Sequence, residues 1–331
     1  MSSPSTPQTP RSRVAVSRDS LPGDSVARLS SVFDVRVWPD ADAPNPSDLA
    51  AFIDDAEGLL GVAKDLIDDQ LLDRCPQLRA VAIASTGYDY VDFEAARRRQ
   101  LLVTHTPAVL SGAVADHAFF LMTGARRRAH EHISMFRSGA WDHHLALDEM
   151  LGLDVYGSTL GIVGYGQVGK AIARRAVCYE MTIQEYSRGP HDDLAKSVEL
   201  DDLLRTSDII VMCLPLLPET THLIGEREFK LMKPSATLVN VGRGATLDEQ
   251  ALATALKESV IHSAGIDVFE SEPISDTAHP LLGLANAFVT PHMASATHAA
   301  RASMVSMAAD DLQAMMEHRA PQHLLAELRH Q

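Results

Sequence analysis

The sequence lacks the features of membrane-spanning, disulfide-rich and nucleic-acid-binding proteins. It has 29 basic against 44 acidic residues, and the resulting net charge of −15 opposes binding to nucleic acids or anionic membranes. No apolar run approaches the length of a membrane span. The three cysteines lie far apart without C-x-x-C spacing, which argues against disulfides or a metal site and favours a reducing compartment, the cytoplasm.

Residues 1–13 lack the apolar segment of a secretory signal, and their three prolines oppose an amphipathic presequence helix. We therefore expect a disordered tail there. From residue 14 onward, short apolar runs alternate with helical patterns, which is typical of parallel sheets covered by helices on both faces. A long apolar helix predicted at 111–126 and a connection through Trp141 interrupt the alternation, so the sequence predicts two α/β units.

The predicted elements follow from this alternation. In the first half, strands are predicted at 14–16, 35–37, 59–62, 78–84 and 102–104, and helices begin near Asp24, Ser47, Asp65 and Phe93. In the second half, strands are predicted at 160–163, 182–186, 209–213, 237–241, 264–268 and 287–290. Helices are predicted there at 170–179, 200–205, 248–258 and about 297–318. We expect the last helix to return to the first unit.

The segment 159–169 combines an apolar strand pattern, three spaced glycines and the start of a helical pattern. Gly164, Gly166 and Gly169 form a G-x-G-x-x-G motif. This arrangement binds a dinucleotide pyrophosphate, because the first glycine permits a tight turn, the second lets phosphates approach the backbone, and the third lets helix and strand pack closely. The phosphates then meet free N–H groups at the helix N-terminus. The alternative is a glycine-rich turn without a ligand.

The residues that follow the next strand favour NADP(H) over NAD(H). An acidic side chain at this place binds the ribose of NAD, whereas an arginine accommodates the 2′-phosphate of NADP. The strand ends at Tyr186, and Ser187 and Arg188 follow, which offer a guanidinium and no repelling carboxylate. Two alternatives stay open. Glu185 could be the ribose acid, although strand alternation points it away from Tyr186, or Arg188 could be only solvated.

Three later segments carry side chains suited to acid–base chemistry, and each follows a predicted strand. Arg243 lies in a turn flanked by glycines, the acids Asp267, Glu270 and Glu272 follow a buried strand, and His292 follows another. Ligands bind beyond the carboxyl ends of parallel strands, so we expect these segments to converge on one edge. Singly, each has a plain structural alternative: a surface ion pair, a solvated acidic loop, or a histidine near a helix start.

Nearly the whole chain after the tail resembles the D-isomer-specific 2-hydroxyacid dehydrogenases. Beside the glycine motif, the resemblance lies in an ordered set of segments: Ser85–Asp92 (STGYDYVD), Val103–Pro107 (VTHTP), Leu214–Gly225 (LPLLPETTHLIG), Asn240–Gly244 (NVGRG), Asp267–Pro273 and Thr290–His292. The number of motifs, and their common order, make the resemblance specific.

The resemblance implies an NAD(P)-dependent enzyme in which Arg243, Glu272 and His292 are catalytic, and it selects Glu272 over Glu270. A histidine suits the proton of a 2-hydroxyl group, since it titrates near neutrality. The carboxylate of Glu272 favours the protonated imidazolium. Arg243 is suited to grip the substrate carboxylate and polarise the 2-keto oxygen. The reaction needs no metal.

Further site residues come from the resemblance alone. It assigns Asp267 to the carboxamide side of the nicotinamide and the backbone of Thr86 and Gly87 to the substrate carboxylate. Other implied cofactor contacts are Gln167, Val168, Cys213, Leu214, Pro215, Thr220, Val241 and Gly242. The sequence departs from the family at His105, where Asn is common, and at Cys213, where His is common. Thr86 replaces the lysine of phosphite-oxidising relatives, which argues against phosphite as the substrate.

The implied fold consists of two doubly wound parallel-sheet domains. A Rossmann cofactor domain, 108–294, is inserted in a flavodoxin-like substrate-binding domain, 14–107 plus 295–331. Glyoxylate or hydroxypyruvate is the expected kind of substrate, because no basic cluster for a phosphate is evident. The alternatives are a non-enzymatic, nucleotide-sensing corepressor-like scaffold and a D-3-phosphoglycerate dehydrogenase without its regulatory domain. Relatives are usually dimeric and associate through the segment that matches the helix at 111–126 and the connection through Trp141, so we expect a homodimer. The alternative for this segment is an interdomain core.

Overall fold

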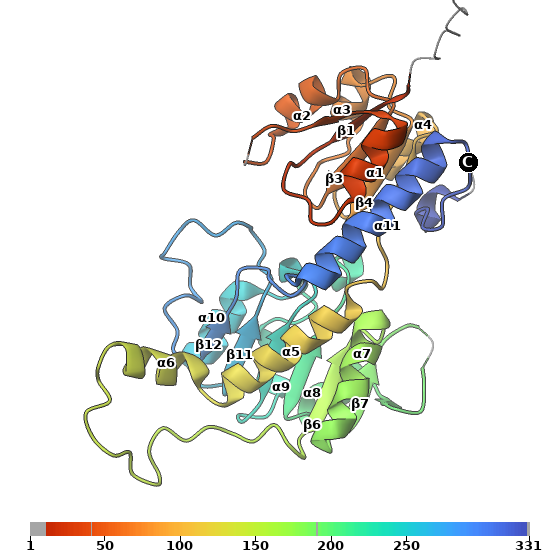
Figure 1. The fold of residues 1–331 in the computed structure, drawn as a ribbon. Coiled ribbons are helices and arrows are strands. Elements are labelled where there is room, and N and C mark those ends of the chain that lie inside the picture. Colours follow the sequence, from red (N-terminus) through yellow and green to blue (C-terminus); the bar gives the residue numbers. More distant parts are fainter. Residues whose placement is uncertain (1–10, 41, 190, 330–331) are drawn as a thin grey trace, which may run out of the picture. The chain divides into compact units, whose positions relative to one another are not determined.

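The computed structural model describes residues 11–329 except 41 and 190, and the chain divides into two compact units. Unit 1 is formed by the chain up to residue 110 together with residues from 297 onward, and unit 2 by residues 111–296 (Figure 1). Of the expected disordered tail, residues 1–10 lie outside the described residues, and Arg13 is the first residue of a strand.

Unit 1 contains a five-stranded parallel sheet with the order β2-β1-β3-β4-β5. Its strands are β1 (Arg13–Val16), β2 (Asp34–Val37), β3 (Gly58–Val62), β4 (Ala80–Ala84) and β5 (Leu102–Thr104). Every residue of β4 is buried, because helices cover both faces of the sheet. This strand order is that of flavodoxin-like doubly wound sheets.

The helices of unit 1 are α1 (Ser25–Val32), α2 (Pro46–Ile53), α3 (Asp69–Arg74), α4 (Phe93–Arg98) and α11 (His298–Met316), with a short 3₁₀ helix η4 (Ala326–Leu328). The side chains of Asn45, Asp68 and Asp92 cap α2, α3 and α4 by accepting a hydrogen bond from the N–H three residues later. The returning helix α11 packs against β3, β4 and α1.

The helix expected near Asp65 begins instead at residue 69, so that prediction was wrong. Asp65 is buried, and its carboxylate accepts a hydrogen bond from the Val62 N–H over 2.8 Å and pairs with Arg18 over 2.9 Å. It therefore closes the turn after β3. Asp68 caps the helix in its place, since its side chain accepts from the Leu71 N–H.

Unit 2 contains a seven-stranded parallel sheet with the order β12-β11-β10-β9-β6-β7-β8. Its strands are β6 (Thr159–Val163), β7 (Thr182–Tyr186), β8 (Lys196–Ser197), β9 (Ile209–Met212), β10 (Thr237–Asn240), β11 (Ser263–Ile266) and β12 (Ala287–Val289). The chain leaves β6 toward β7 and β8, and then restarts at β9 on the other side of β6. This is the doubly wound, Rossmann-type order. The predicted fold class of two parallel-sheet domains is thereby confirmed.

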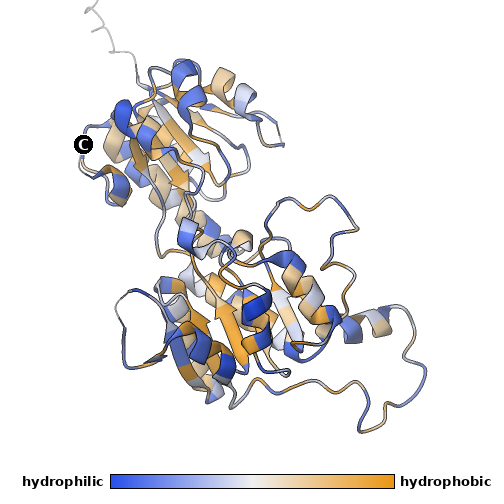
Figure 2. Ribbon diagram, turned by 180° about the vertical axis from the view of Figure 1, so that it is seen from behind, coloured by the Kyte–Doolittle hydropathy of each residue, from blue (hydrophilic) through white to orange (hydrophobic). Residues whose placement is uncertain are grey.

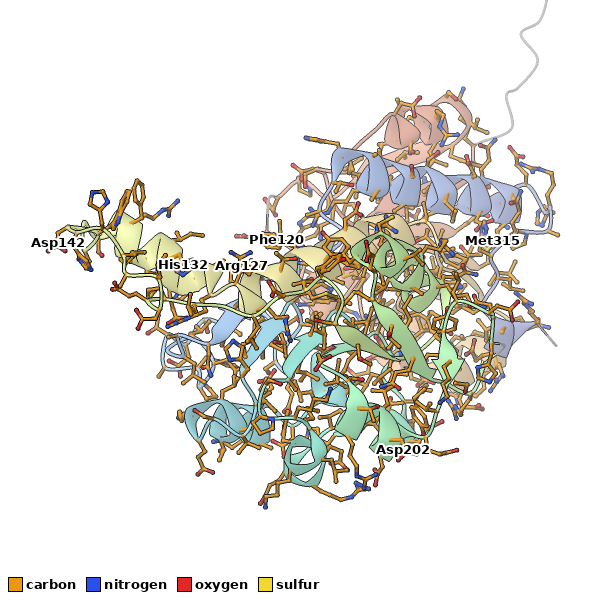
Figure 3. All side chains as sticks on the ribbon, turned by 90° about the horizontal axis from the view of Figure 1, so that it is seen from below. Phe120, Arg127, His132, Asp142, Asp202 and Met315 are labelled. Carbon is orange, nitrogen blue, oxygen red and sulfur yellow. The ribbon has the colours of Figure 1, made fainter. Side chains whose placement is uncertain are left out.

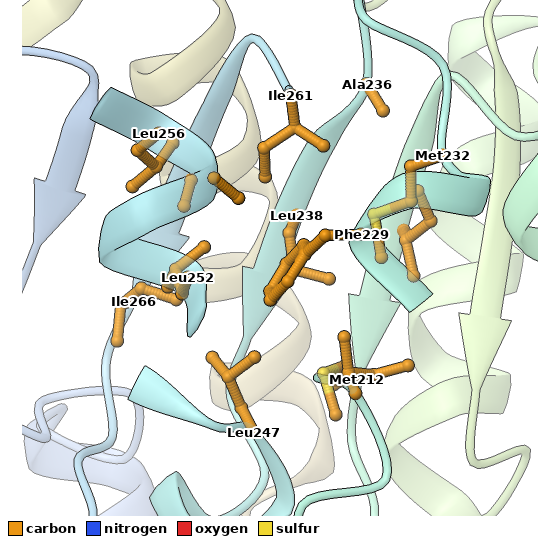
Figure 4. Packing of buried hydrophobic residues seen from close by; sticks show 14 of the residues in the cluster. Met212, Phe229, Met232, Ala236, Leu238, Leu247, Leu252, Leu256, Ile261 and Ile266 are labelled. Atoms are coloured by element: carbon orange, nitrogen blue, oxygen red, sulfur yellow. The ribbon is translucent and has the colours of Figure 1, made fainter. Parts of the chain in front are cut away.

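The helices of unit 2 are α5 (Ser111–Arg126), α6 (Ala129–Arg137), α7 (Gln167–Ala176), α8 (Leu200–Thr206), α9 (Glu226–Leu231) and α10 (Glu249–Lys257). Three 3₁₀ helices are η1 (Val177–Tyr179), η2 (Pro218–Thr220) and η3 (Gly244–Thr246). Residues of α5 and α7 form one apolar cluster with the sheet, and residues of α8, α9 and α10 form another. Figure 4 shows Phe229 of α9 and Leu238 of β10 together in the second cluster.

The sequence pattern does not predict α6, α9 or β8. The other strands and helices could be predicted from their hydropathy. In Figure 2 the strands are predominantly apolar, and most helices alternate apolar and polar residues. No residue of α6 is buried, so this helix has no apolar face that packs within unit 2. In Figure 3, α6 and the segment after it, which carry the labelled His132 and Asp142, project from the unit 2 sheet. None of the helices among residues 11–329 is both long and apolar enough to cross a bilayer.

Candidate active site

The carboxyl ends of the parallel strands of unit 2 form one edge, and the predicted site segments of this unit all lie there. The glycine loop follows β6, residues 187–188 follow β7, 213–220 follow β9, 241–244 follow β10, 267–272 follow β11 and 290–292 follow β12. The loops after β6 and β9 diverge because the chain changes direction between these strands. Open α/β sheets bind their ligands at such a switch point.

The glycine loop has the conformation that a phosphate site requires. Gly164 adopts a φ of +101°, which favours glycine. A Cβ atom on Gly169 would lie 2.3 Å from the Gly164 carbonyl oxygen, so only glycine allows the loop to approach α7 so closely. No side chain caps the N-terminus of α7, and a Cβ atom on Gly166 would meet no described atom within 4 Å. Uncapped N–H groups beside open space fit a dinucleotide pyrophosphate.

Two neighbouring loops pack against the glycine loop. The Cys213 thiol donates a hydrogen bond to the Gly164 carbonyl over 2.8 Å, and burial raises its pKa to about 12, so it stays protonated at neutral pH. A Cβ atom on Gly242 would lie 2.7 Å from the Leu214 carbonyl oxygen, so the loops after β9 and β10 touch. The remaining predicted cofactor residues lie in the same places: Gln167 and Val168 in the first turn of α7, Pro215 and Thr220 after β9, and Val241 after β10.

Ser187 and Arg188 continue from β7 at this edge. The Ser187 hydroxyl is buried and has no hydrogen-bond partner among the described residues, which fits a site that a ligand completes. Arg188 is exposed but not merely solvated, because its Nη1 lies 2.8 Å from Glu219 Oε1. Glu185, the alternative ribose acid, is fully buried, and its Oε1 lies 2.5 Å from His191 Nδ1. Its carboxylate therefore lies inside unit 2.

Arg243 lies in a turn that the side chain of Asn240 holds. Asn240 donates through Nδ2 to the Arg243 carbonyl over 3.1 Å and accepts through Oδ1 from the Gly242 N–H over 3.0 Å. A Cβ atom on Gly244 would lie 1.8 Å from the carbonyl carbon of Phe269, so this turn presses on the loop after β11. The Arg243 guanidinium is partly exposed and donates through Nη1 to the Gly242 carbonyl over 2.9 Å.

His292 and Glu272 form a close pair. His292 Nδ1 lies 2.7 Å from Glu272 Oε2, and Glu272 Oε1 accepts from the Phe269 N–H over 2.9 Å. The Glu272 side chain is 15% exposed and that of His292 is 46% exposed, so the ring reaches solvent while its partner is held by the backbone. Glu270 instead contacts His222 over 3.0 Å. Of these two acids, Glu272 therefore stands beside His292.

Asp267 holds the backbone of the His292 segment. Its fully buried carboxylate accepts hydrogen bonds from the N–H groups of Met293 over 2.8 Å and Ala294 over 2.9 Å. Its own carbonyl accepts from the His292 N–H over 2.8 Å. His292 adopts a φ of +54°, a left-handed conformation that is uncommon for a residue with a side chain. The three bonds stabilise this conformation against its strain.

Two more side chains complete the Asp267 site. Thr290 Oγ1 lies 2.5 Å and His117 Nε2 lies 3.1 Å from Asp267 Oδ1. Burial alone would raise the pKa of Asp267, but the hydrogen bonds from His117, Thr290 and the two backbone N–H groups hold the pKa below its ordinary value. His117 lies within α5, and sequence reasoning missed it because a histidine in an apolar helix pattern gives no indication of a partner 150 residues away.

Comparisons with known proteins agree with this geometry. A family model for the D-isomer specific 2-hydroxyacid dehydrogenase, NAD binding domain, matches residues 119–294. The glyoxylate reductase of Thermococcus gammatolerans is 41% identical to this chain over 316 residues, which are 92% of this chain and 93% of that protein. The chain belongs to the D-isomer specific 2-hydroxyacid dehydrogenase family. Unit 2 is the nicotinamide-cofactor domain of this family member.

Solved structures resemble the dehydrogenase over its length. A protein from Thermus thermophilus has a TM-score of 0.89 and 37% identity, covering 95% of this chain and 100% of its own. An NADPH-dependent glyoxylate/hydroxypyruvate reductase from Sinorhizobium meliloti has a TM-score of 0.84 and 31% identity, covering 96% and 99%. These relatives do not favour the corepressor-like scaffold or the phosphoglycerate dehydrogenase.

In unit 1 of the dehydrogenase, Thr86 and Gly87 lie in the loop after β4. Thr86 donates through Oγ1 to the Thr106 carbonyl, and its own carbonyl contacts His105 Nδ1, both over 2.9 Å. Burial lowers the pKa of His105 despite this contact, so its ring is neutral at pH 7 and donates through Nδ1. Tyr90 donates to the Gly87 carbonyl over 2.6 Å. The loop is thus fixed through its carbonyl groups.

Proposed function

We propose that this dehydrogenase reduces small unphosphorylated 2-keto acids, such as glyoxylate and hydroxypyruvate, to D-2-hydroxy acids and prefers NADPH over NADH. The observation that carries the proposal is the His292–Glu272 pair, at 2.7 Å, on the sheet edge that also bears the glycine loop. The names of the relatives, glyoxylate reductase and NADPH-dependent glyoxylate/hydroxypyruvate reductase, support this substrate class and cofactor.

The residues at the end of β7 support the preference for NADPH. Arg188 offers a guanidinium that fits a 2′-phosphate, and the unpartnered Ser187 hydroxyl offers a hydrogen bond. Glu185 already pairs with His191 through Oε1 over 2.5 Å, which disfavours it as a ribose ligand, although its Oε2 is buried without a partner among the described residues. The pyrophosphate would be held by the backbone at Gly164 and Gly166 and by the N-terminus of α7.

In this mechanism His292 moves the proton. When bound, the reduced nicotinamide supplies a hydride to the carbonyl carbon of the substrate. Glu272 fixes the His292 ring through Nδ1, which leaves Nε2 to hold a proton and donate it to the oxygen that becomes the hydroxyl. The Glu272 carboxylate is itself held by the Phe269 N–H, so it keeps the ring oriented for this donation. Asp267 keeps the backbone of His292 in place.

In unit 2, Arg243 would bind the substrate carboxylate. A guanidinium pairs with a carboxylate through two parallel hydrogen bonds and also stabilises charge on a neighbouring oxygen. The N–H groups of Thr86 and Gly87 donate to no acceptor among the described residues, and their carbonyl groups are already engaged. These N–H groups are therefore suited to donate hydrogen bonds to a ligand carboxylate.

The decisive experiment is a steady-state assay of NADPH and NADH oxidation with glyoxylate, hydroxypyruvate and a phosphorylated 2-keto acid. We expect turnover with the two small acids, a higher kcat/KM with NADPH, and weak use of the phosphorylated acid. Arg243→Lys is an informative companion, because it keeps the charge but loses the two-pronged grip, and it should raise KM for the keto acid. No turnover with either cofactor would contradict the proposal and support a non-enzymatic role.

We also infer a homodimer that associates through α5, α6 and the following segment. Large apolar side chains there are exposed: Phe120 by 51%, Ile133 by 50%, Phe136 by 66%, Trp141 by 53% and Leu147 by 100%. The ring centroids of Phe136 and Trp141 lie 6.0 Å apart, and exposed apolar side chains that lie together mark association surfaces. Sedimentation should give twice the chain mass of 35.9 kDa. Phe136→Asp should shift the protein toward the monomer, and a wild-type monomer would contradict the inference.

A further inference from the structure

An ion pair spans the two loops that flank the glycine loop. Arg188 follows β7, and Glu219 lies in η2, in the loop after β9. In the sheet, β7 and β9 are the two neighbours of β6, whose carboxyl end begins the glycine loop. The contact between Arg188 Nη1 and Glu219 Oε1, at 2.8 Å, therefore joins the loops on either side of the predicted phosphate site.

We propose that Glu219 is a specificity-determining residue that limits the preference of this enzyme for NADP(H) by competing with the 2′-phosphate for Arg188. The inference rests on the proposed role of Arg188. A 2′-phosphate brings about two negative charges beside the carboxylate that already occupies one side of the guanidinium. The ribose of NAD(H) carries a neutral hydroxyl at that position and leaves the ion pair intact. Glu219 thus disfavours the binding of NADP(H) but not that of NAD(H).

Glu219 is held in place to act in this way. The hydroxyl of Thr220 donates to the Pro215 carbonyl over 2.8 Å and accepts from the Leu217 N–H over 2.8 Å, which fixes the turn that carries Glu219. The pKa of Glu219 lies below its ordinary value because of a hydrogen bond from its own backbone and another from Arg188, so it is ionised at neutral pH. Its charge is therefore present whenever the cofactor binds.

The Arg188–Glu219 ion pair is also weak enough for a ligand phosphate to replace the Glu219 carboxylate at Arg188. The side chains of Arg188 and Glu219 are 73% and 54% exposed, and ion pairs in such positions contribute little. Replacing the carboxylate by a phosphate should therefore cost about two- to fivefold in affinity for NADP(H). By contrast, Glu185 is buried against His191 and makes no contact with Arg188 among those the structure describes. The discriminating carboxylate thus comes from the loop after β9 rather than from β7.

The test measures Kd for NADP⁺ and NAD⁺ by calorimetry, and kcat/KM for NADPH and NADH with glyoxylate. We expect Glu219→Gln to tighten NADP⁺ binding about two- to fivefold and to leave NAD⁺ binding unchanged. Glu226→Gln is the matched control, because it removes an equal charge from a pair with Lys230 on α9, and it should change neither constant. In an Arg188→Ala background, Glu219→Gln should give a smaller gain for NADP⁺, because only the direct repulsion between carboxylate and phosphate is then relieved, and it should leave NAD⁺ binding unchanged.

The outcomes separate this inference from the proposed function. An unchanged or lowered NADP⁺ preference in Glu219→Gln overturns the inference, as does an equal gain in the Arg188→Ala background. If Arg188→Ala does not weaken NADP⁺ binding, Arg188 does not bind the 2′-phosphate, and the proposed function is contradicted on this point together with the inference that rests on it. If nucleotides bind as expected but no keto acid is reduced, the substrate proposal fails, while the calorimetry still decides the role of Glu219.

Discussion

Replacing Asp267 by asparagine tests whether this carboxylate holds the reacting histidine. The carboxylate is fully buried and accepts four hydrogen bonds, two from side chains and two from the N–H groups of Met293 and Ala294. Asparagine has the same shape, but it keeps one acceptor oxygen and turns the other into a donor. At least one N–H or O–H group would then face another donor inside the protein.

The expected loss follows from that count. A hydrogen bond to a charged group contributes about 1.5–3 kcal/mol, and a buried group left without a partner adds a similar cost. We therefore expect Asp267→Asn to lower the free energy of unfolding by about 3–5 kcal/mol. For a domain of this size, that corresponds to a fall in Tm of about 6–20 °C. A shift of His292 by about an ångström should reduce kcat on the order of 100-fold.

The variant should also change the dependence of stability on pH. Hydrogen bonds hold the folded pKa of Asp267 below its ordinary value of 3.8. Its stabilising contribution is therefore complete above that ordinary value and is lost as the pH falls through the lower folded pKa. The Tm of the wild type should fall more steeply than that of Asp267→Asn as the solution is acidified below about pH 5.

Differential scanning calorimetry between pH 3 and 8 and steady-state turnover at neutral pH measure these effects. Asp193→Asn is the control, since Asp193 is an exposed acid of the same unit and its replacement changes the net charge equally. A wild-type Tm in Asp267→Asn would refute the hydrogen-bond account. A lowered Tm with wild-type kcat at a temperature where the variant is folded would refute the positioning of His292.

Three further predictions concern the same edge. His292→Ala should lower kcat about 10²–10⁴-fold while leaving the Kd for NADPH, measured by fluorescence, almost unchanged; near wild-type turnover would contradict its role. His117→Leu should lower Tm and kcat by removing a donor to the buried carboxylate, and His117→Gln, which keeps a donor, should restore part of both. Gly244→Ala should prevent stable folding, because its Cβ atom would lie 1.8 Å from the Phe269 backbone, whereas Gly283→Ala, with no atom within 4 Å, should be tolerated.

The strands and the glycine loop could be predicted because their signals are local. The strand residues 160–163 are apolar without interruption, and the sheet buries them on both faces. The spacing of Gly164, Gly166 and Gly169 directly reflects the turn and the close approach to α7. The helix at 111–126 has its predicted bounds because its long run of small and apolar residues packs on the sheet.

Other features depend on partners that the sequence does not display. Asp65 looks like the start of a helix because it precedes apolar residues, yet its carboxylate is engaged by Val62 and Arg18. The helix α6 has no buried residue, and its large apolar side chains Ile133 and Phe136 are exposed, so no packing within unit 2 distinguishes it from a polar connection. The pairing of Arg188 with Glu219 joins residues 31 positions apart on two exposed turns, and only the strand order brings them together.

Two acidic residues hold different parts of His292: Asp267 holds its backbone, and Glu272 holds its imidazole ring. A left-handed residue with a side chain carries strain, so its backbone needs strong and rigid partners; the buried Asp267 supplies these from the end of the neighbouring strand β11. The imidazole needs a partner that fixes the ring through one nitrogen while leaving the second nitrogen accessible, and Glu272 supplies this from the loop beyond β11. Both acids belong to the segment that follows one strand. Their different burial therefore accounts for their different roles, because a fully buried carboxylate is saturated by donors, whereas a partly exposed one can adjust to a charge that changes during the reaction.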